Sequence, residues 1–512
     1  MEPPSVDARP APSWAVWVLG GFPNYGENAP LDLDVSGPQV ARQFLDLIKS
    51  GGFDDFADTL ARVGNCARPI RLRGGSERVD TVTGEVLSSY SSAVEPFGVT
   101  YVRCGNRRAS ECPSCSRLYA RDVFEMIRAG VSGGKTVPAS VADNPLVFAT
   151  VTAPSFGRVH RHTGGACRPA APGMCQHGRS MVCRIHHGES DELVGQPLCP
   201  DCYDYESQVV WQWWSTQLWR RFTIVLRRLL AKRLGVPERR LREIATIQYA
   251  KIAEYQSRGA IHFHALVRLD GRRCAEGFAP APETVDARQL ARLVRSAAQS
   301  AWLIAPPVDG DDVGRRIVFG AQLDARPVSA TGRTDDPDQR LLPEQVAGYL
   351  AKYATKSATD SGPGQTSHGR RLEATARRLA ARGGFDSVAT GGVSPYRLLR
   401  KWADALGFRG HFASRSQRYS ITLGALRRAR RRAQALIAQA NAQGRVLDLA
   451  AMEADLLADD DAEATVVIGH WTYDGCGWAN DAEHALAVAA AARAREYEQW
   501  RADQRRSGQL VH

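Results

Sequence analysis

The hydrophobic pattern changes period several times along the chain. Apolar residues recur at helical spacing in VARQFLDLIKSGGFDDFADTLARVG, in CSRLYARDVFEMIRAG and in YESQVVWQWWSTQLWRRFTIVLRRLLAKRLG. Between the last two helical segments lies NPLVFATVTAPSFG, an apolar β-branched run closed by Pro and Gly, which predicts a buried strand. Further on, REIATIQYAKIAEYQSRGAIHFHALVRLDG has a period of two. This segment predicts two strands joined in a hairpin.

The predicted hairpin turns at 257–259, a three-residue loop in which Gly259 supplies the left-handed position. Side chains at i and i+2 of a strand point the same way, so His262 and His264 share a face. In the register that this loop sets, Glu254 lies opposite His262 on that face. Two imidazoles and a carboxylate with open coordination positions suit Mg²⁺ or Mn²⁺ acting as a Lewis acid.

A second group of candidate catalytic residues lies in a helix predicted to begin near Pro343. Tyr349 and Tyr353 are one turn apart on one face, and Lys352 and Lys356 form a parallel pair beside them. A phenol with a pKa of ~10 is a poor nucleophile, but a neighbouring ammonium and a metal-polarised phosphate would each help it attack. Taken alone, the pattern fits an amphipathic helix with two core tyrosines. Together with the upstream histidine strand, it favours a nucleophile.

The composition is that of a globular protein with ample core. The chain has 512 residues, 44% of them hydrophobic and 24% charged, which excludes wholesale disorder and predicts several domains. The first residues contain an acid at Glu2 and only a brief apolar run, so we expect no secretory signal, no membrane span and a cytoplasmic location. The net charge of +11 favours a polyanionic partner. It is a weak indication, since the excess of arginine also fits a GC-rich coding sequence.

The cysteines point to zinc. Two Cys-x-x-Cys pairs, Cys112/Cys115 and Cys199/Cys202, lie in Gly- and Pro-rich loops, whereas redox motifs of this spacing sit at strand-to-helix junctions. In a reducing compartment such pairs hold zinc more often than they form disulfides. Zinc takes four N or S ligands in a tetrahedron. We therefore expect one or two structural zinc ions.

The first predicted zinc site comprises Cys66, Cys104, Cys112 and Cys115. The second lies in a Cys- and His-rich insertion at 160–205 that offers more ligands than one ion needs, so the spacing does not decide which four bind. Its main candidates are Cys175, Cys183, His187, Cys199 and Cys202, with His177 and His186 also available.

One apparent phosphate-binding motif does not meet the requirements of a nucleotide-binding loop. Residues 130–136 resemble a nucleotide-binding loop, but the required first glycine is Ala129, and the preceding residues look helical instead of forming a strand. No ATP-driven motor is predicted, so a separate helicase is implied.

The chain has a strand with two histidines followed by a helix with two tyrosines. In this order, the two elements resemble the HUH endonucleases, and specifically the rolling-circle replication initiators. VFATVTAPSFG is similar to their first strand motif, AEYQSRGAIHFHALVRLDG to their metal motif, and YLAKYATK to the two-tyrosine motif of the phage A-protein type. The whole chain, including CPSC, PLCPDCYDY and LGFRGHFASRSQRYS, resembles the replication initiators of actinomycete integrative elements and plasmids such as pSAM2.

The resemblance implies an α+β fold with a central antiparallel sheet that bears the metal site, zinc-binding insertions and a helical C-terminal region. It implies that Tyr349 or Tyr353 attacks a scissile phosphate, forming a 5′-phosphotyrosine and a 3′-OH primer, and that the other cuts the regenerated origin before the strand is rejoined. Lys352 and Lys356 would position phosphate or assist proton transfer. The implied metal ligands are His262, His264 and Glu254. The implied partners are single- and double-stranded origin DNA and the host helicase and polymerase.

Four regions are expected. They are 1–140 with the first zinc module, 141–365 as the nuclease domain with its insertion, 366–430 as a basic DNA-contacting segment, and 431–512 as a helical tail. Origin recognition should lie outside the nuclease core. The candidate phosphate-contacting residues are Arg409, Arg415 and Arg418.

Other functions remain open at this point. A two-tyrosine transposase would share both motifs and a zinc module. A relaxase fits less well, because its nucleophile usually precedes the histidine motif. A zinc-containing DNA-binding regulator without catalysis would use Tyr349 and Tyr353 only as core residues.

Overall fold

The computed structural model describes residues 37–170, 173–274, 277–328, 346–351, 366–390, 394–445, 447–448, 452–457 and 465–507. It divides into two compact units, a smaller one formed by Met1–Ala120 with Asp459–His512 and a larger one formed by Arg121–Ala458. Helices and antiparallel sheets occur in both. The α+β class expected from the sequence is confirmed.

The smaller unit is built on an antiparallel sheet in the order β13-β1-β2, with β3 also paired to β1. Its strands are β1 (Ile70–Asp80), β2 (Val86–Ser91), β3 (Thr100–Val102) and β13 (Thr465–Cys476). Its helices are α2 (Pro38–Lys49), α3 (Phe53–Arg62), η2 (Ser92–Val94) and α11 (Asp481–Arg506). Phe56, Leu60, Trp478 and Leu486 are buried in its core.

β13 corrects the expectation of a helical tail over 431–512. Its sequence, TVVIGHWTYDGC, is rich in the β-branched and aromatic residues that favour strands. It pairs with the whole of β1, from Ile70 opposite Cys476 to Asp80 opposite Thr465. Segments from opposite ends of the sequence therefore fold as one sheet.

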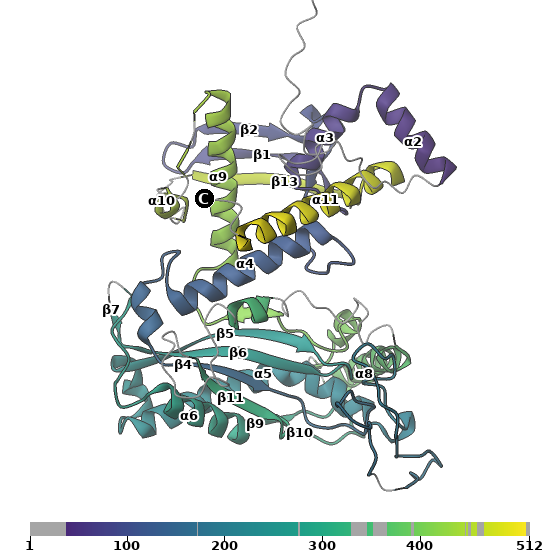
Figure 1. Cartoon of the computed structure of the whole chain (residues 1–512), viewed down its shortest axis with the longest axis vertical. Coiled ribbons are helices and arrows are strands. Elements are labelled where there is room, and N and C mark those ends of the chain that lie inside the picture. The colour runs from purple at the N-terminus through teal and green to yellow at the C-terminus, as the bar shows by residue number, and fades with distance from the viewer. Residues whose placement is uncertain are drawn as a thin grey trace, which may run out of the picture. The chain divides into compact units, whose positions relative to one another are not determined.

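The larger unit carries a five-stranded antiparallel sheet in the order β11-β4-β6-β5-β12 (Figure 1). Its strands are β4 (Leu146–Val151), β5 (Ala245–Tyr255), β6 (Ile261–Gly271), β11 (Leu323–Val328) and β12 (Ala413–Arg415), with the short pairs β7 (Arg273–Cys274), β8 (Gly277–Phe278), β9 (Trp302–Ala305) and β10 (Arg315–Val318). Its helices are α5 (Tyr205–Arg233), α6 (Ala287–Ser300), α8 (Ser367–Thr390), α9 (Leu423–Ala442), α10 (Glu453–Leu457), η3 (Ala139–Asp143), η4 (Pro200–Cys202), η5 (Glu238–Glu243) and η7 (Leu399–Trp402). α4 (Pro113–Ser132) crosses the division and occupies the place where a nucleotide-binding loop would need a strand.

One face of this sheet packs on α5. Trp211, Trp213 and Trp219 of α5 are buried with Val147, Phe263 and other residues of the strands. The indole nitrogens of Trp211 and Trp213 donate to the carbonyls of Val318 and Pro395, at 2.7 and 3.1 Å. These three tryptophans are therefore core residues.

The hairpin has the register predicted from its loop. Gln256 donates to the carbonyl of Ala260 at 2.9 Å, and Gly259 has a φ of 70°. Glu254 lies directly opposite His262. Because Phe263 enters the α5 core, the two histidines on either side of it point to the opposite face.

The core beneath this hairpin contains a charged residue, Lys251. Its side chain faces α5, with Nζ 4.3 Å from the ring centre of Phe263 and 5.4 Å from that of Trp219. Burial lowers the pKa of Lys251 to about 7. The unfolded chain holds the proton up to its ordinary pKa of about 10.5, so wild-type stability should rise between pH 7 and pH 10 and level off below pH 7.

We expect Lys251→Met to stabilise the protein at pH 7, by at most about 5 kcal/mol, and to flatten this pH dependence. Urea unfolding at pH 7 and pH 9.5 measures both effects, with Lys232→Met, an exposed lysine of α5, as the matched control. Equal pH slopes in wild type and Lys251→Met would contradict the expectation.

Candidate active site and metal centres

The two histidines of β6 converge on one carboxylate of β5. The Nε2 atoms of His262 and His264 lie 2.8 and 3.1 Å from the same oxygen, Oε2 of Glu254. The side chains of His262, His264 and Glu254 are 16%, 4% and 7% exposed. The register Glu254↔His262 brings them together. Three ligand atoms predicted to share a face thus meet at one point.

This group fits a divalent cation. Its two imidazole nitrogens and one carboxylate oxygen all lie within 4.8 Å of one another. Such a set leaves coordination positions open for substrate. Burial lowers the pKa of His264 and outweighs the raising effect of the hydrogen bond to Glu254. Burial thus favours the neutral imidazole, the form that binds metal.

Thr150 of β4 supports His264 from the next strand. The two residues are paired across β4 and β6, and Thr150 Oγ1 lies 2.9 Å from His264 Nδ1. With Nε2 coordinating a metal, the proton of the neutral ring would lie on Nδ1 and be donated to the threonine oxygen, which would fix both the tautomer and the ring orientation. Phe148 stacks on the same imidazole, with ring centres 5.8 Å apart and an interplanar angle of 7°.

We expect Thr150→Val to weaken metal binding about 10- to 100-fold, because the imidazole loses the acceptor that orients it. Titrating Mn²⁺ into the full chain by calorimetry measures this. Thr246→Val, on the other end of the sheet where Thr246 donates to the carbonyl of Gly271, is the control. Equal affinity of the two variants would mean that Thr150 does not position the ligand.

Tyr349 stands beside these histidines. Residues 346–351 are helical, and Val346, Ala347, Leu350 and Ala351 are buried. The Tyr349 ring contacts His264 edge to face with centres 5.5 Å apart, and Phe148 at 5.8 Å. Its side chain is 41% exposed. The other predicted residues of this motif, Lys352, Tyr353 and Lys356, lie outside the described residues.

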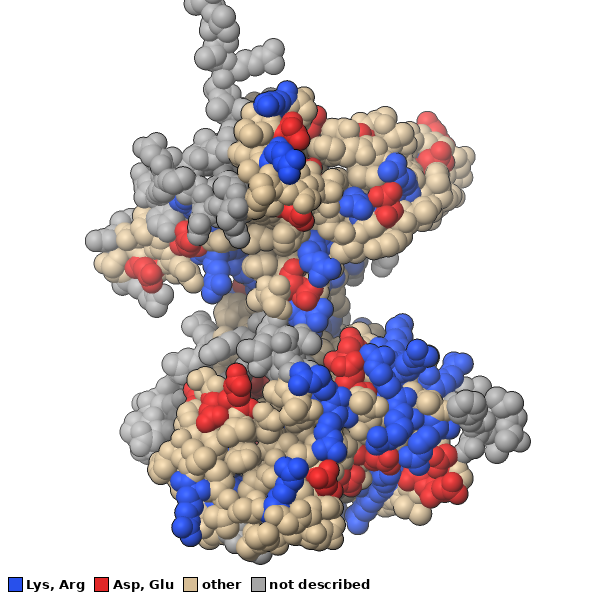
Figure 2. Space-filling view, turned by 90° about the vertical axis from the view of Figure 1, so that its right-hand side faces the viewer, with Lys and Arg blue, Asp and Glu red and all other residues tan. Residues whose placement is uncertain are grey.

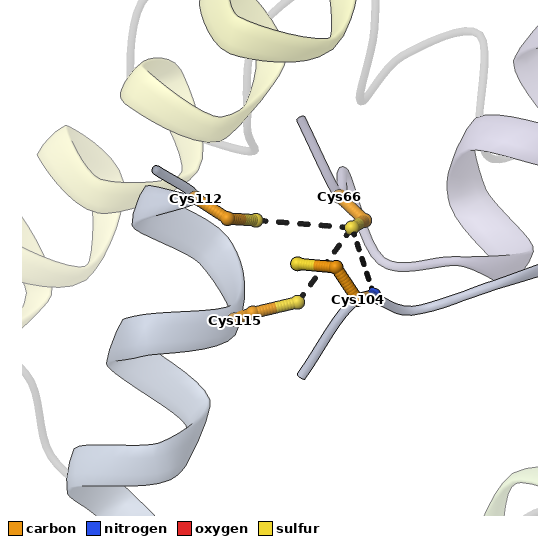
Figure 3. A group of neighbouring side chains, drawn as sticks. All are labelled: Cys66, Cys104, Cys112 and Cys115. Atoms are coloured by element: carbon orange, nitrogen blue, oxygen red, sulfur yellow. Dashed lines mark hydrogen bonds between the residues drawn. The ribbon is translucent and has the colours of Figure 1, made fainter. Parts of the chain in front are cut away.

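Four cysteines gather in the smaller unit (Figure 3). Cys66 Sγ lies 3.8 Å from that of Cys112 and 3.7 Å from that of Cys115, and Cys104 completes the group. Backbone amides of Ala67, Cys104 and Asn106 donate to three of the sulfurs. Hydrogen bonds from Cys104 and Cys66 lower the pKa of Cys112 and bring that of Cys115 to about 6, whereas the contacts within the cluster raise the pKa of Cys66 and Cys104. Thiolates, the form that binds zinc, are thus favoured at Cys112 and Cys115.

In the insertion, the structure corrects the expectation of a single second group. Its donors form two separate sets, each within 4.8 Å. The first set is His160, Cys167, Cys183 and His187, and the second is Cys175, His177, Cys199 and Cys202. His160 and Cys167 were not among the predicted ligands, because neither belongs to a close Cys pair. Neither set includes His186.

The arginines predicted to contact DNA differ in their surroundings. Arg409 lies over the rings of Trp213 and Trp214, at 4.3 and 5.5 Å. Arg415 donates to the backbone carbonyls of Ser416 and Gln417. Burial lowers the pKa of both guanidinium groups. Arg418 is exposed.

Other exposed arginines line α8, namely Arg370, Arg371, Arg377 and Arg378. Figure 2, which views the side of the larger unit where α8 lies in Figure 1, shows basic side chains gathered on this face.

Comparisons with known proteins identify the family of the chain. A family model described as "Replication initiator protein, pSAM2" matches residues 52–492. A replication initiator protein of Streptomyces ambofaciens is 40% identical over 455 residues, which cover 84% of this chain and 89% of that protein. No solved structure matches the chain. Within the described residues, no helix is both long and apolar enough to cross a membrane. The chain therefore belongs to the family of pSAM2 replication initiators.

Proposed function

We propose that this replication initiator nicks one strand of its origin with a tyrosine nucleophile, in the manner of the HUH endonucleases. The observation that carries the proposal is the convergence of His262 and His264 on Glu254, with the Tyr349 ring 5.5 Å from that of His264. A metal-ligand group and a partly exposed phenol on one face of a sheet are what a phosphoryl transfer to tyrosine requires.

The reaction exchanges one phosphodiester for another. The phenolic oxygen of Tyr349 or Tyr353 bonds to the scissile phosphorus and gives up its proton, and the bond from phosphorus to the 3′ oxygen breaks. That oxygen takes up a proton and leaves as a 3′-OH, which primes synthesis, while the 5′ phosphate stays on the tyrosine. Attack by a 3′-OH on the phosphotyrosine runs the same exchange backwards and rejoins the strand.

Mg²⁺ or Mn²⁺ held by His262, His264 and Glu254 would polarise the scissile phosphate. The protein contributes the fixed orientation of the ligands, through Thr150, and the placement of the phenol beside them. Under this proposal Lys352 and Lys356 position phosphate or assist proton transfer, and the tyrosine that did not act first cuts the regenerated origin. Single- and double-stranded origin DNA are the substrates; a host polymerase extends the 3′-OH while a host helicase separates the strands.

The alternatives are less well supported. A non-catalytic regulator would keep Tyr349 in the core, whereas its side chain is 41% exposed. A two-tyrosine transposase shares the chemistry, but the family match and the relative of 40% identity are both replication initiators.

The proposal is tested with a single-stranded oligonucleotide carrying the origin of the protein's own element. We expect a nick that requires Mg²⁺ or Mn²⁺, that leaves a 3′ end which a DNA polymerase can extend, and that is absent with a scrambled oligonucleotide. Specific binding without cleavage under either metal would contradict the proposal and favour the regulator.

A further inference from the structure

The Cys- and His-rich insertion has no core of its own. Between 160 and 202, the buried residues that the structure describes are Cys167, Cys183, His187, Gly195, Pro197 and Cys199. None of them is a large aliphatic or aromatic residue. The described residues of the segment also form no helix or strand except η4 at its end, and they contain isolated bridges such as Arg168↔Cys183. A segment of this size without an apolar core needs another source of stability, and in small domains bound metal supplies it.

The two donor sets alternate along the chain. The first set takes its ligands from His160 and Cys167 and then from Cys183 and His187. The second takes them from 175–177, which lies between those pairs, and from 199–202, which follows them. Each set therefore closes a loop that contains part of the other. We call this interleaved arrangement of ligands cross-braced.

The first set has the local geometry of a metal site. His187 Nε2 lies 3.4 Å from Cys183 Sγ and 3.2 Å from His160 Nδ1. His187 Nδ1 lies 2.7 Å from Oδ2 of Asp191. When Nδ1–H donates a hydrogen bond to this carboxylate oxygen, Nε2 is free to coordinate a metal. The amide of Arg161 donates to Cys167 Sγ at 3.2 Å.

The second set is similarly close-packed. His177 Nδ1 lies 3.2 Å from Cys202 Sγ and 3.7 Å from Cys199 Sγ. Cys175 completes a Cys₃His set, one of the combinations found in structural zinc sites.

The insertion also forms one wall of a pocket of about 550 Å³ beside the hairpin loop. Arg161 and Arg168 line it from the insertion, and Thr152 and Gln256 line it from the sheet. Thr152 comes directly after the end of β4, which carries Thr150, and Gln256 directly after the end of β5, which carries Glu254, so the pocket lies at the end of the two strands that support the metal-ligand group.

The charges in this pocket suit a phosphodiester backbone. Arg161 and Arg168 donate to the backbone carbonyls of Cys167 and Val159, and in the described part of the chain neither forms an ion pair. Glu189 is the acidic residue that lines the pocket. Like charges crowded together in this way are stabilised by a bound anion.

Two contacts attach the insertion to the hairpin and to α8. Gly195, with a φ of 89°, packs so closely that a Cβ there would lie 2.2 Å from the carbonyl carbon of Ser257. Asp201 is paired with Arg371 of α8 at 3.2 Å. The wall of the pocket is therefore held against the hairpin only as long as the insertion keeps its fold.

We propose that the insertion at 160–205 is a cross-braced module that binds two zinc ions, and that this module shapes a pocket for the backbone of single-stranded DNA next to the proposed catalytic face. The two-zinc module stands independently of the proposed function, whereas the identity of the DNA strand rests on it.

The metal part is tested by elemental analysis of the purified full chain. With the Cys66 cluster also loaded, we expect three zinc ions per chain. The double variant His160→Gln/Cys167→Ser should lose at least one, and so should Cys199→Ser/Cys202→Ser, whereas Cys274→Ser, an exposed cysteine outside the four metal-binding groups of the described residues, should lose none. One zinc per chain after reconstitution with excess zinc would overturn the module.

The pocket part is tested by fluorescence anisotropy of labelled single-stranded origin DNA over a range of salt concentrations. Arg161→Ala/Arg168→Ala should keep the wild-type zinc content and lower the slope of log K against log salt by about 1.4, as expected for two lost phosphate contacts. Arg179→Ala/Arg184→Ala changes the charge equally at exposed positions of the module and should lower it less. Equal effects of the two pairs would overturn the pocket. Absence of a nick with this salt response intact would count against the proposed chemistry alone.

Discussion

Replacing His264 by alanine should lower the rate of origin cleavage at least ~10³-fold, because it removes one of three ligands of the catalytic metal, whose charge stabilisation amounts to several kcal/mol. The imidazole is 4% exposed and contacts Glu254, Thr150 and the ring of Tyr349. Its loss therefore affects both the ligand set and the surroundings of the nucleophile.

A quenched-flow or gel assay of the oligonucleotide nick at saturating Mn²⁺ measures this effect. Circular dichroism establishes that the variant folds, and His411→Ala, which removes an exposed histidine of the same unit, should cleave at the wild-type rate. Cleavage by His264→Ala within tenfold of wild type would mean that the histidine strand does not hold the catalytic metal.

Loss of the Cys66 cluster should have the largest effect on stability. Cys66 is fully buried, and its sulfur is close to those of Cys112 and Cys115 from a distant part of the sequence. Its carbonyl accepts a hydrogen bond of 2.9 Å from the indole of Trp478, which ties the C-terminal segment to the same place. Zinc bound there would join segments that otherwise share a small core.

We expect Cys66→Ser, or a strong zinc chelator, to destabilise the smaller unit by at least ~3 kcal/mol and to lower its thermal midpoint by about 10 °C. Differential scanning calorimetry follows the transition. Cys476→Ser is the control, since Cys476 is an exposed cysteine of the same unit outside the cluster. An unchanged transition in both the variant and the chelated protein would show that the four thiols hold no structural metal.

The convergence of His262 and His264 on Glu254 was predictable because it depends on local sequence. The loop at 257–259 fixes the register of the hairpin, and the register alone places Glu254 opposite His262. The support from Thr150 was not predicted, since it comes from a separate strand whose pairing with β6 no short-range pattern sets.

The Cys and His clusters were likewise predictable only where their members lie close together in the sequence. Cys112 and Cys115 are one turn apart and form an evident pair, and their partners Cys66 and Cys104 could be proposed from the few cysteines nearby. In the insertion, ligands of two sets alternate, so spacing along the chain groups residues that the fold separates. Likewise, β13 finds its partner β1 at the other end of the sequence, and a local reading assigned that region to a helical tail.

The most direct test of the account is to identify the residue that becomes joined to DNA. The full chain is incubated with single-stranded origin DNA and Mn²⁺, and the denatured product is digested and analysed by mass spectrometry, alongside Tyr349→Phe, Tyr353→Phe and the double variant. The account predicts a peptide carrying a 5′-phosphotyrosine at Tyr349 or Tyr353, absent from the double variant. A nick without such an adduct, or an adduct that persists in the double variant, would contradict it.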